Sequence, residues 1–430
     1  MIDLEYLKQN IEEYKQNLAN RQLDAAKFLL ERVIRRYDEK KELTKHIQEL
    51  ERQRNLLTGK VEEAQKAKEL KAALQSLTTT LRDVERELST LWSALPNRVS
   101  EKMPAGKNSQ DNKIIKEWGE KRVFPFPVKD HIELGKDLDL IDIEASAKIS
   151  GARFYFLKND LVLLQWALFT FVLNKLTQRG FILMLPPIIV KEPALFGTGY
   201  FPLEKDQIYE VKGSIEEKEP KFLVGTSEVS LVAYESNRLF QKNELPKKYA
   251  GYSSCFRSEA GSWGKDVKGI KRVHQFEKIE MIYFTTPETS QQYMEEARTI
   301  EEEILQELCL PYRVVEMCTG DVGFATYRKW DIEVWLPSSN DYFESSKNKP
   351  VYMEIMSNSD LWDYQARRLN IRQKPQSGSK SEYVHTISAT AITNTRPLLA
   401  ILENFQQADG SIVIPKVLQQ YMGKEVIKSK

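Results

Sequence analysis

Two charged residues of opposite sign stand two positions apart in the segment Cys255–Ser262, which reads CFRSEAGS. If the segment is a strand, Arg257 and Glu259 project from the same face, because alternate residues of a strand point the same way. A cation beside an anion could hold a small molecule that carries both a phosphate and an amine. An isolated pair of this kind is also common as an ion pair on a protein surface. The rest of the chain must decide between these interpretations.

The residues that follow predict a second strand that returns beside the first. After a basic, glycine-rich loop comes the run VHQFEKIEMIYF, which is typical of a strand. This strand would bring Phe276 and Glu280 to the same region as Arg257 and Glu259. Near the end of the chain, ITNTRPLLAILEN places Arg396 just before a helix that has proline in its first turn. These five side chains are the first candidates for a site.

Common nucleotide and hydrolase motifs are absent from the sequence. It contains no G-x-G-x-x-G before a helix, no G-x-x-x-x-G-K-[ST] and no G-x-S-x-G. If the chain handles a nucleotide, it does so without the common phosphate loops. Cys255, Cys309 and Cys318 lack the paired short spacing of a zinc site, so we expect buried free thiols and no zinc.

The bulk composition is that of an ordinary soluble protein. The chain has 430 residues, which is too many for one core, with 41% hydrophobic and 29% charged residues. Its net charge is +1, so binding to nucleic acid would need local patches. The longest apolar run, residues 161–173, contains Gln165 and is too short to span a bilayer. The N-terminus MIDLEYLKQN has no apolar signal core, and we expect a cytoplasmic protein without a membrane partner.

The first 95 residues are the most regular part of the sequence. They contain no proline and one glycine, Gly59, and are rich in good helix formers. Apolar residues on both sides of Gly59 recur mostly at alternating steps of four and three, which is the pattern of a coiled coil. We predict an antiparallel helical hairpin with its turn at Thr58 and Gly59. The seam residues are Leu43, Ile47, Leu50, Leu57, Leu70, Leu74, Leu77, Leu81, Val84, Leu88 and Leu91.

Basic residues are frequent on the outer faces of this hairpin. Acidic residues are interleaved with them, so these faces are either merely solvated or bind the phosphates of a nucleic-acid backbone. The basic residues are Arg32, Arg35, Arg36, Lys40, Lys41, Lys45, Arg52, Arg54, Lys60, Lys66, Lys68 and Lys71.

A change of composition indicates two domains. The segment 96–112, PNRVSEKMPAGKNSQDN, breaks the helical pattern with proline, glycine and asparagine. Beyond it, strand-like and helix-like runs alternate without a strict βαβ rhythm, which favours an α+β domain on a largely antiparallel sheet flanked by helices. We predict a helical hairpin arm over residues 1–105 and this α+β domain over residues 106–430.

Several strings of the sequence resemble a known family. RGFILMLPPIIV, the CFRSE segment and ITNTRPLLAILEN are similar, in order and spacing, to the signature motifs of class II aminoacyl-tRNA synthetases. LFGTGYFP, LVGTSEVSL and DIEVWLP narrow the resemblance to bacterial-type seryl-tRNA synthetases, and the N-terminal hairpin extends it to the whole chain. The resemblance implies that serine and ATP form seryl-adenylate, and that the seryl group then moves to the 3′ end of tRNA(Ser). The tRNA(Sec) is a further candidate substrate.

The resemblance also implies roles for single residues. Arg257, Glu259 and Arg396 would be catalytic: Arg257 would grip the α-phosphate and the serine carboxylate, and Arg396 would lie near the γ-phosphate. Glu259 would accept a hydrogen bond from the adenine amino group, Phe276 would stack on adenine, and Val273 would contact ATP through its backbone. The implied ATP-binding set is Arg257, Ser258, Glu259, Val273, Phe276, Glu354, Ile355, Met356, Ser357 and Arg396.

Magnesium and serine have implied sites as well. Glu354 and Ser357 in MEIMSNSD would bind Mg²⁺, which prefers hard oxygen ligands, although the family usually has a second serine where this chain has Met356. Glu280 and Thr390 would recognise the serine hydroxyl, while threonine would lack room for its methyl group. The implied serine-binding set, with Thr226 and Glu228 on the amino side, is Thr226, Ser227, Glu228, Arg257, Glu280 and Thr390.

This chain departs from the family pattern near its site. It reads HTISATAITNTR, where bacterial members mostly have asparagine and serine at the positions of Ser388 and Thr390. Thr390 keeps a hydroxyl, but Ser388 loses an amide, which puts one polar contact in doubt. Trp263, in the loop expected to meet the tRNA acceptor end, either stacks on a base or is a surface aromatic without a role.

The resemblance implies partners, and two other interpretations stay open. The prolines of LMLPP belong to the dimer-forming motif of the family, so we expect a homodimer in which the tRNA spans both subunits and is bound through the arm. A relative that loads an amino acid onto a carrier protein would lack the long hairpin. A non-catalytic homologue would have lost its charged site residues, yet the chain retains Arg257, Glu259, Glu280, Glu354 and Arg396.

Overall fold

The protein divides into a helical unit and a unit built on a sheet. The two compact units are Met1–Arg98 and Val99–Lys430. The predicted boundary between residues 105 and 106 stays a prediction. The structure is a computed structural model that describes residues 1–57, 63–213, 219–260, 269–340, 351–374 and 380–429.

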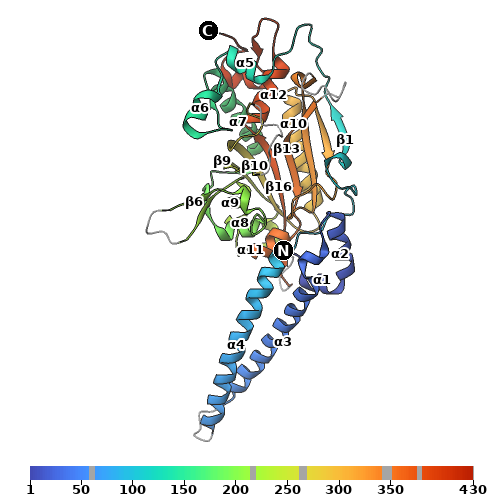
Figure 1. Ribbon diagram of the computed structural model, residues 1–430, viewed down its shortest axis with the longest axis vertical. Coiled ribbons are helices and arrows are strands. Elements are labelled where there is room, and N and C mark those ends of the chain that lie inside the picture. The colour runs from blue at the N-terminus through green and yellow to red at the C-terminus, as the bar shows by residue number, and fades with distance from the viewer. Residues whose placement is uncertain (58–62, 214–218, 261–268, 341–350, 375–379, 430) are drawn as a thin grey trace. The chain divides into compact units, whose positions relative to one another are not determined.

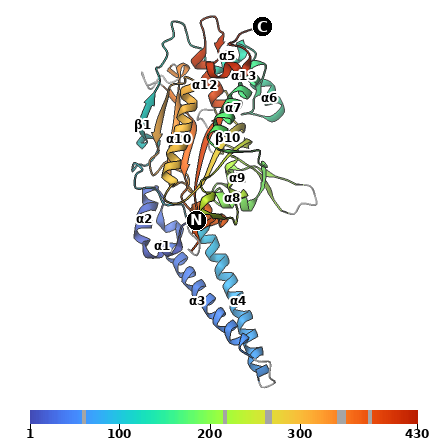
Figure 2. The ribbon, with the colours of Figure 1, turned by 180° about the vertical axis from the view of Figure 1, so that it is seen from behind.

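Two long helices dominate the N-terminal unit. Helices α3 (Leu30–Asn55) and α4 (Ala64–Ser93) lie side by side and antiparallel, as the heptad pattern predicts (Figures 1 and 2). The turn predicted at Thr58 and Gly59 lies outside the described residues. Shorter helices precede α3, namely α1 (Leu4–Gln9), α2 (Ile11–Asn20) and the 3₁₀ helix η1 (Ala25–Phe28).

The short helices, which the heptad pattern does not predict, form a core with one end of the hairpin. Leu7, Tyr14 and Leu18 are fully buried there together with Leu88 of α4. The Tyr14 hydroxyl donates a hydrogen bond of 2.7 Å to the carbonyl oxygen of Pro96. Because this contact joins residues far apart in the sequence, it fixes both ends of the unit to one another.

The second unit is built on an eight-stranded sheet with the order β1-β11-β12-β13-β16-β10-β9-β4. All neighbouring pairs are antiparallel except β4 and β9, which confirms the predicted fold class. The strands are β1 (Lys113–Trp118), β4 (Ile182–Met184), β9 (Lys247–Phe256), β10 (Gln275–Thr285), β11 (Tyr312–Glu316), β12 (Arg328–Leu336), β13 (Val351–Asp360) and β16 (His385–Thr393).

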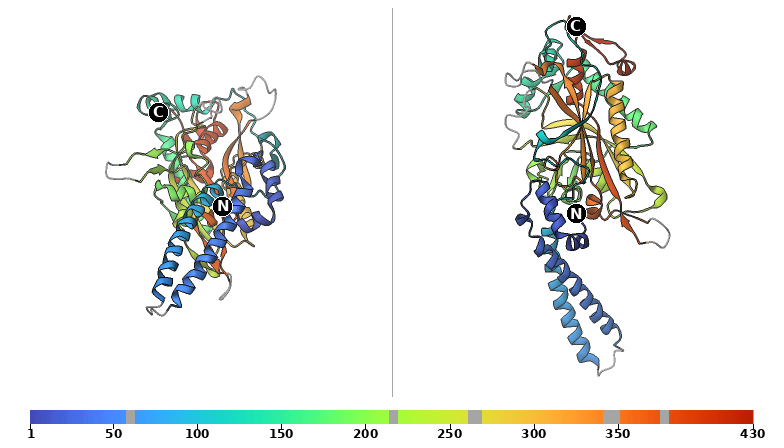
Figure 3. Two further views of the ribbon diagram at one scale, coloured as in Figure 1. Left: turned by 60° about the horizontal axis from the view of Figure 1, so that its bottom comes forward. Right: turned by 90° about the vertical axis from the view of Figure 1, so that its right-hand side faces the viewer.

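Helices flank this sheet. α10 (Ser290–Glu307) runs along one face and contacts β13 and β16 (Figure 3). α7 (Asp160–Gln178) and α12 (Thr395–Phe405) contribute to the same hydrophobic core. By length and composition α7 could cross a membrane, but half of its apolar stretch is buried inside the unit, as in the core helix of a globular domain.

Smaller elements surround the sheet. A three-stranded sheet is formed by β5 (Ile189–Lys191), β7 (Lys221–Leu223) and β6 (Glu210–Val211). The additional helices are α5 (His131–Asp137), α6 (Ile143–Ser150), α8 (Glu192–Thr198), α9 (Glu228–Tyr234), α11 (Tyr364–Leu369) and α13 (Lys416–Met422). The additional strands are β2 (Ile141–Asp142), β3 (Phe156–Leu157), β5 (Ile189–Lys191), β6 (Glu210–Val211), β7 (Lys221–Leu223), β8 (Leu239–Gln241), β14 (Arg372–Lys374), β15 (Glu382–Tyr383), β17 (Ile412–Val413) and β18 (Val426–Ile427).

Two irregularities in the large sheet decide which side chains share a face. The pairing of β12 with β13 leaves Ile355 as an extra residue, and the pairing of β10 with β16 does the same with Ala391. An extra residue of this kind is a β-bulge, and it reverses the alternation of side chains along the strand. Glu354 and Ser357, which are three positions apart, therefore lie on the same side of the sheet.

Two local expectations are corrected by the structure. Arg396 does not precede α12 but lies inside its first turn, because the helix begins at Thr395. Cys255 and Cys318 are buried, but Cys309 is exposed. Cys309 follows the end of α10 with a positive φ of 54°, and this sharp turn leaves its side chain outside the core.

Candidate active site

A cavity of about 470 Å³ lies over the central strands of the large sheet. Strands β10, β12, β13 and β16 contribute residues to its wall, together with the segments before β10 and at the start of α12. Most of the residues singled out from the sequence line this cavity. They are Glu228, Arg257, Glu259, Val273, Phe276, Glu280, Glu354, Ile355, Met356, Ser357, Thr390 and Arg396.

Three predicted residues do not line the cavity. Thr226 is buried, and its hydroxyl donates to the carboxylate of Glu280 at 3.4 Å. Ser227 is also buried and donates to a backbone carbonyl of β9 at 3.1 Å. The hydroxyl and amide of Ser258 both donate to carbonyls of the 3₁₀ helix η4 (Lys205–Gln207). Trp263 lies outside the described residues.

Arg257 and Glu259 both line the cavity, but they are not a pair on one strand. β9 ends one residue before Arg257, and Glu259 has a positive φ of 52°. The Glu259 carboxylate instead pairs with Arg272 at 2.8 Å. The Arg257 guanidinium lies 5.4 Å from the centre of the Phe276 ring, and its Nε donates to the carbonyl of Gly225 at 3.3 Å. The prediction of a shared strand face is therefore wrong, although both side chains reach the same cavity.

Arg396 joins the start of α12 to the sheet. Its Nη1 donates to the backbone carbonyl of Glu354 at 2.7 Å and lies 3.5 Å from the Glu354 carboxylate. Its Nε donates to the carbonyl of Lys271 at 3.1 Å. Burial alone would raise the pKa of Glu354, but the cations Arg396, Lys329 and Arg257 outweigh burial and lower this pKa. The carboxylate is therefore ionised at neutral pH.

A second acid lies near Glu354. Asp331 of β12 is directly opposite Ser357 in the sheet, and its carboxylate is 3.0 Å from Nζ of Lys329. Burial raises the pKa of Asp331 to about 7; Lys329 opposes this shift and Glu354 adds to it. Because of the bulge at Ile355, two carboxylates and a hydroxyl converge on one side of the sheet. Such hard oxygen donors fit a magnesium ion.

Two further carboxylates, those of Glu280 and Glu228, line the cavity. Glu280 forms an ion pair with Lys278 and accepts a hydrogen bond of 2.8 Å from Ser388. Glu228 accepts a hydrogen bond of 2.6 Å from the amide of Gln365. Burial, and then the neighbouring Glu280, raises the pKa of Glu228 to about 7. This region can accept an ammonium group and a hydroxyl.

Ser388 and Thr390 both belong to this region. The shorter side chain of Ser388 reaches Glu280, because its hydroxyl donates to one oxygen of that carboxylate at 2.8 Å. Thr390 lies directly opposite Glu280 in the pairing of β10 with β16. Both side chains therefore face the acid that was expected to recognise a hydroxyl.

The sequence reasoning missed several charged residues of the cavity, among them Lys278, Arg272, Lys329 and Glu204. Lys278 could have been found, because it stands at the same spacing of two as Phe276 and Glu280 on one strand. Lys329 carried no such signal, since a lysine at the start of a strand usually indicates solvent exposure.

Glu228→Gln is expected to make the protein more stable at pH 8 but not at pH 5. The pKa of Glu228 is raised on folding, so the folded state holds a proton that the unfolded state loses as pH rises from about 4.5 towards 7. Stability is therefore lost over this range, and glutamine avoids the loss. We expect a gain of about 1–2 kcal/mol at pH 8 by urea unfolding. Glu244→Gln is the control with the opposite sign, because a hydrogen bond from Gln241 lowers that pKa. An equal gain at both pH values would contradict the prediction.

Similar proteins share the full length of this chain. The serine–tRNA ligase of Treponema denticola is 42% identical and the alignment covers 98% of this chain and 99% of that protein. The serine–tRNA ligase of Dictyoglomus turgidum is 40% identical over 100% of both. The crystal structure of seryl-tRNA synthetase from Pyrococcus horikoshii complexed with ATP has a TM-score of 0.89 at 34% identity, with 100% of both chains covered. The cytoplasmic serine–tRNA ligase of Naegleria fowleri in complex with AMP has a TM-score of 0.86 at 29% identity, covering 100% and 99%.

Residues 209–405, which carry most of the cavity, match the tRNA synthetase class II core domain (G, H, P, S and T). The antiparallel sheet and its arginine-lined cavity are thus those of a class II aminoacyl-tRNA synthetase. Residues 1–100 match the seryl-tRNA synthetase N-terminal domain. With both matches and its full-length relatives, this chain belongs to the seryl-tRNA synthetase family.

Proposed function

We propose that the chain activates L-serine with ATP in this cavity and transfers the seryl group to the 3′ end of tRNA(Ser). Membership of the family makes the chain a ligase that forms an aminoacyl-tRNA bond. The observation that carries the assignment to this cavity is that Arg257 and Arg396 line the same cavity as Glu228 and Glu280. Cations for a triphosphate and acids for an amino acid therefore face the same space.

Activation needs positioning more than a side-chain nucleophile. A serine carboxylate oxygen attacks the α-phosphorus, the bond from that phosphorus to the bridging oxygen breaks, and pyrophosphate leaves with the electron pair. The carboxylate is already ionised at neutral pH, so no base is required. Arg257 can hold the attacking carboxylate and the α-phosphate together, because its Nε is anchored on Gly225. The Phe276 ring, 5.4 Å from that guanidinium, offers a face for the adenine.

Serine selection rests on the acidic part of the cavity. Glu228 would receive the ammonium group, whose charge would reverse the raised pKa of this acid. Glu280 would accept a hydrogen bond from the serine hydroxyl, held in place by Lys278 and Ser388. A site that hydrogen-bonds a hydroxyl rejects the analogue without it by a factor of about 10⁴, since its polar groups are left unpaired.

Mg²⁺ would be held by Glu354 and Ser357. The donor set fits, because Glu354 is ionised and the bulge at Ile355 brings the Ser357 hydroxyl to the same side. Asp331 lies opposite Ser357 and can orient its hydroxyl, as second carboxylates commonly do around metal ligands. When bound, the ion would neutralise charge on the ATP phosphates.

A homodimer is part of the proposal, and its interface would include β4. Ile182 and Leu183 of this edge strand are 46% and 44% exposed, Leu185 directly after it is 82% exposed, and Trp166 of α7 is 51% exposed. Apolar side chains on an open sheet edge favour association with another chain. We expect Leu185→Glu to shift the protein from dimer to monomer in sedimentation velocity. The exposed Val123→Glu, in a loop away from β4, is the control and should remain dimeric. A monomeric wild type would contradict the homodimer.

The arm would bind the tRNA, with a second subunit supplying the active site. Several cations of the hairpin are engaged with acids, such as Arg32 and Arg36 with Glu87 and Lys40 with Glu85. Other cations are exposed and take part in no ion pair among the described residues. These are Arg35, Lys45, Arg54, Lys66, Lys68 and Lys71. The unengaged cations are the better phosphate ligands, because they need not leave an acid to bind.

A triple change of Lys66, Lys68 and Lys71 to glutamine is expected to weaken tRNA(Ser) binding about tenfold near 0.1 M salt. The slope of log K against log salt should fall by about 2 to 3, roughly one for each phosphate that the arm no longer neutralises. Filter binding over a salt series gives both numbers. The matched control changes Arg32, Arg36 and Lys40, which are already neutralised by Glu87 and Glu85, and should show a smaller slope change. Equal slopes for both triples would contradict the assignment.

Pyrophosphate exchange tests the proposed function. Purified protein is assayed with ATP and, separately, serine, threonine, alanine and glycine, and then with tRNA(Ser) or a carrier protein as acceptor. We expect exchange with serine alone and transfer to tRNA(Ser) alone. Absence of exchange with every amino acid would favour a non-catalytic role. Transfer to the carrier protein would place the chain among the relatives that load an amino acid onto a carrier protein. A parallel assay with tRNA(Sec) tests the second acceptor, and fractionation tests the prediction of a cytoplasmic protein.

A further inference from the structure

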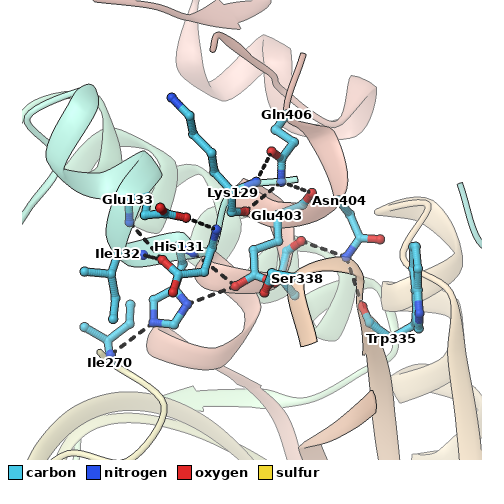
Figure 4. A network of polar contacts seen from close by, with 12 residues as sticks. Lys129, His131, Ile132, Glu133, Ile270, Trp335, Ser338, Glu403, Asn404 and Gln406 are labelled. Atoms are coloured by element: carbon cyan, nitrogen blue, oxygen red, sulfur yellow. Dashed lines mark hydrogen bonds and ion pairs between the residues drawn. The ribbon is translucent and has the colours of Figure 1, made fainter. Parts of the chain in front are cut away.

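Outside the cavity, several segments meet at one buried carboxylate, that of Glu403 on α12 (Figure 4). One oxygen accepts hydrogen bonds from the backbone amide of His131 at 3.1 Å and from its Nδ1 at 2.9 Å. The other oxygen accepts from the hydroxyl of Ser338 at 2.7 Å. The side chains of His131 and Glu403 are 2% and 0% exposed. The acid is thus satisfied by several donors and held rigidly inside the fold.

The opposite edge of the imidazole faces the chain just before β10. The amide of Ile270 donates to Nε2 of His131 at 3.4 Å (Figure 4). Because Nε2 accepts this bond, the proton of the neutral ring must lie on Nδ1, which donates it to Glu403. Gly269 packs against the ring so closely that a Cβ there would lie 2.0 Å from Nε2. The ring is therefore both a hydrogen-bond partner and a steric stop for this backbone.

The residues directly after Ile270 belong to the cavity. Lys271, Arg272 and Val273 all line it. The carbonyl of Lys271 accepts from Arg396, and Arg272 pairs with Glu259. Any displacement of residues 269–270 would move these wall residues and disturb both contacts.

Helix α12 holds this wall segment at two points. Arg396, in its first turn, binds the carbonyl of Lys271 directly. Glu403, seven residues further along the helix and so on the same face, binds Ile270 through His131. With two attachments to one rigid helix, the wall is fixed in both position and orientation.

We propose that His131 is a positioning residue for ATP binding. It transmits the position of α12 to residues 270–273 and so places Arg272, Val273 and the pair of Glu259 with Arg272 around the nucleotide. The proposal rests on the proposed function of the cavity. His131 touches no reacting group, and the serine-binding acids Glu228 and Glu280 lie on other elements. Loss of the His131 contact should therefore weaken ATP binding and leave serine binding nearly unchanged.

Two substitutions test the contacts of the two imidazole nitrogen atoms separately. In His131→Asn the side-chain amide can replace Nδ1 and keep the bond to Glu403, but it is too short to reach Ile270. In His131→Gln the longer chain carries its polar end to the place of Nε2, and the backbone amide of residue 131 keeps its 3.1 Å hydrogen bond to Glu403, so the link from α12 to Ile270 is preserved. We expect about a tenfold increase in the ATP dissociation constant for His131→Asn and less than a threefold increase for His131→Gln. Calorimetric titration with ATP alone, without serine, measures both constants.

Ser338→Ala is the matched control, because it removes a hydrogen bond from the same Glu403 carboxylate without touching Ile270. Its ATP dissociation constant should stay within twofold of wild type. In pyrophosphate exchange, His131→Asn should raise KM for ATP and change KM for serine less than twofold. Thermal unfolding confirms that each variant is folded.

The outcomes distinguish this proposal from the proposed function. If the wild type binds no ATP, the proposed function fails. If the wild type binds ATP and His131→Asn binds it equally well, or if Ser338→Ala weakens binding as much, His131 has no positioning role. Should His131→Asn not fold, Gly269→Ala is the second probe, since both the added methyl group and the positive φ of 67° at this position force residues 269–270 to move while His131 and Glu403 stay intact. Unchanged ATP binding in a folded Gly269→Ala protein would equally overturn the proposal.

Discussion

Replacement of Arg257 by glutamine is expected to lower kcat for serine-dependent pyrophosphate exchange by about 10³. The guanidinium can bond the attacking carboxylate and the α-phosphate at once, and the negative charge on the phosphoryl oxygens is greatest as the reaction proceeds. Its Nε bond to Gly225 and its place over the Phe276 ring hold it ready before the substrates arrive. Exchange at saturating serine and ATP gives kcat directly.

Arg257→Lys should recover only part of this loss, because an ammonium cannot make two parallel hydrogen bonds. Arg238→Gln is a suitable control, since Arg238 also lies over a phenylalanine, Phe240, and pairs with Glu244, yet it is remote from the cavity. Its exchange rate should stay near that of wild type. A fully active Arg257→Lys protein would mean that charge alone is used, and the two-point contact would then be wrong.

Replacement of Glu280 by glutamine is expected to lower kcat/KM for serine by about 10³. The carboxylate is held by Lys278, by Ser388 and by Thr226, so its remaining acceptor capacity points into the cavity. An amide of the same size presents donors where the serine hydroxyl needs an acceptor, and it leaves Lys278 without its counter-charge. Selectivity for serine over alanine should fall at the same time, because the alanine complex loses no such bond. Exchange rates at low serine and low alanine measure both effects.

Glu277→Gln provides the control for this experiment. Glu277 is the third residue before Glu280 on the same strand, but its carboxylate accepts from Ser254 and does not line the cavity. It should leave kcat/KM for serine within about threefold, as for most substitutions outside a site. If Glu277→Gln and Glu280→Gln lose activity equally, the effect comes from the strand as a whole. Retained selectivity against alanine in Glu280→Gln would place hydroxyl recognition elsewhere.

The sequence alone was sufficient for features that follow from regular periodicity. The heptads predict the pairing of α3 and α4, and the alternating run around Phe276 and Glu280 predicts β10 as a wall of the site. Periodicity gives no information where the backbone leaves its regular form. The positive φ of Glu259 and its bond to Arg272 depend on the path of the chain after β9, and no local pattern reports them.

Two other features could not be predicted from the sequence for a different reason. They are the helices α1 and α2 and the buried hydrogen bond between His131 and Glu403. Each depends on partners that lie far away in the chain, such as Pro96 for Tyr14 and Glu403 for His131. His131, which precedes IELGKD in the sequence, belongs to no periodic pattern of apolar or charged residues. Its contact with Glu403 is therefore seen only when α5 and α12 pack together. Family resemblance supplied the roles of Arg257 and Arg396, whereas composition alone would have stopped at an α+β domain with a helical arm.

The bulges at Ile355 and Ala391 each change which face of the sheet the following residues of the strand occupy. Along a regular strand, side chains at odd and even positions point to opposite faces of the sheet, one towards the core and one towards the cavity. With Ile355 as an extra residue, Glu354 and Ser357 lie on one face although they are three positions apart. In a strand without a bulge, residues at that spacing would lie on opposite faces. Deleting Ile355 would leave Glu354 and Ser357 two positions apart, and in a regular strand residues with that spacing again lie on one face. The two donors therefore share a face either at a spacing of three with the bulge or at a spacing of two without it.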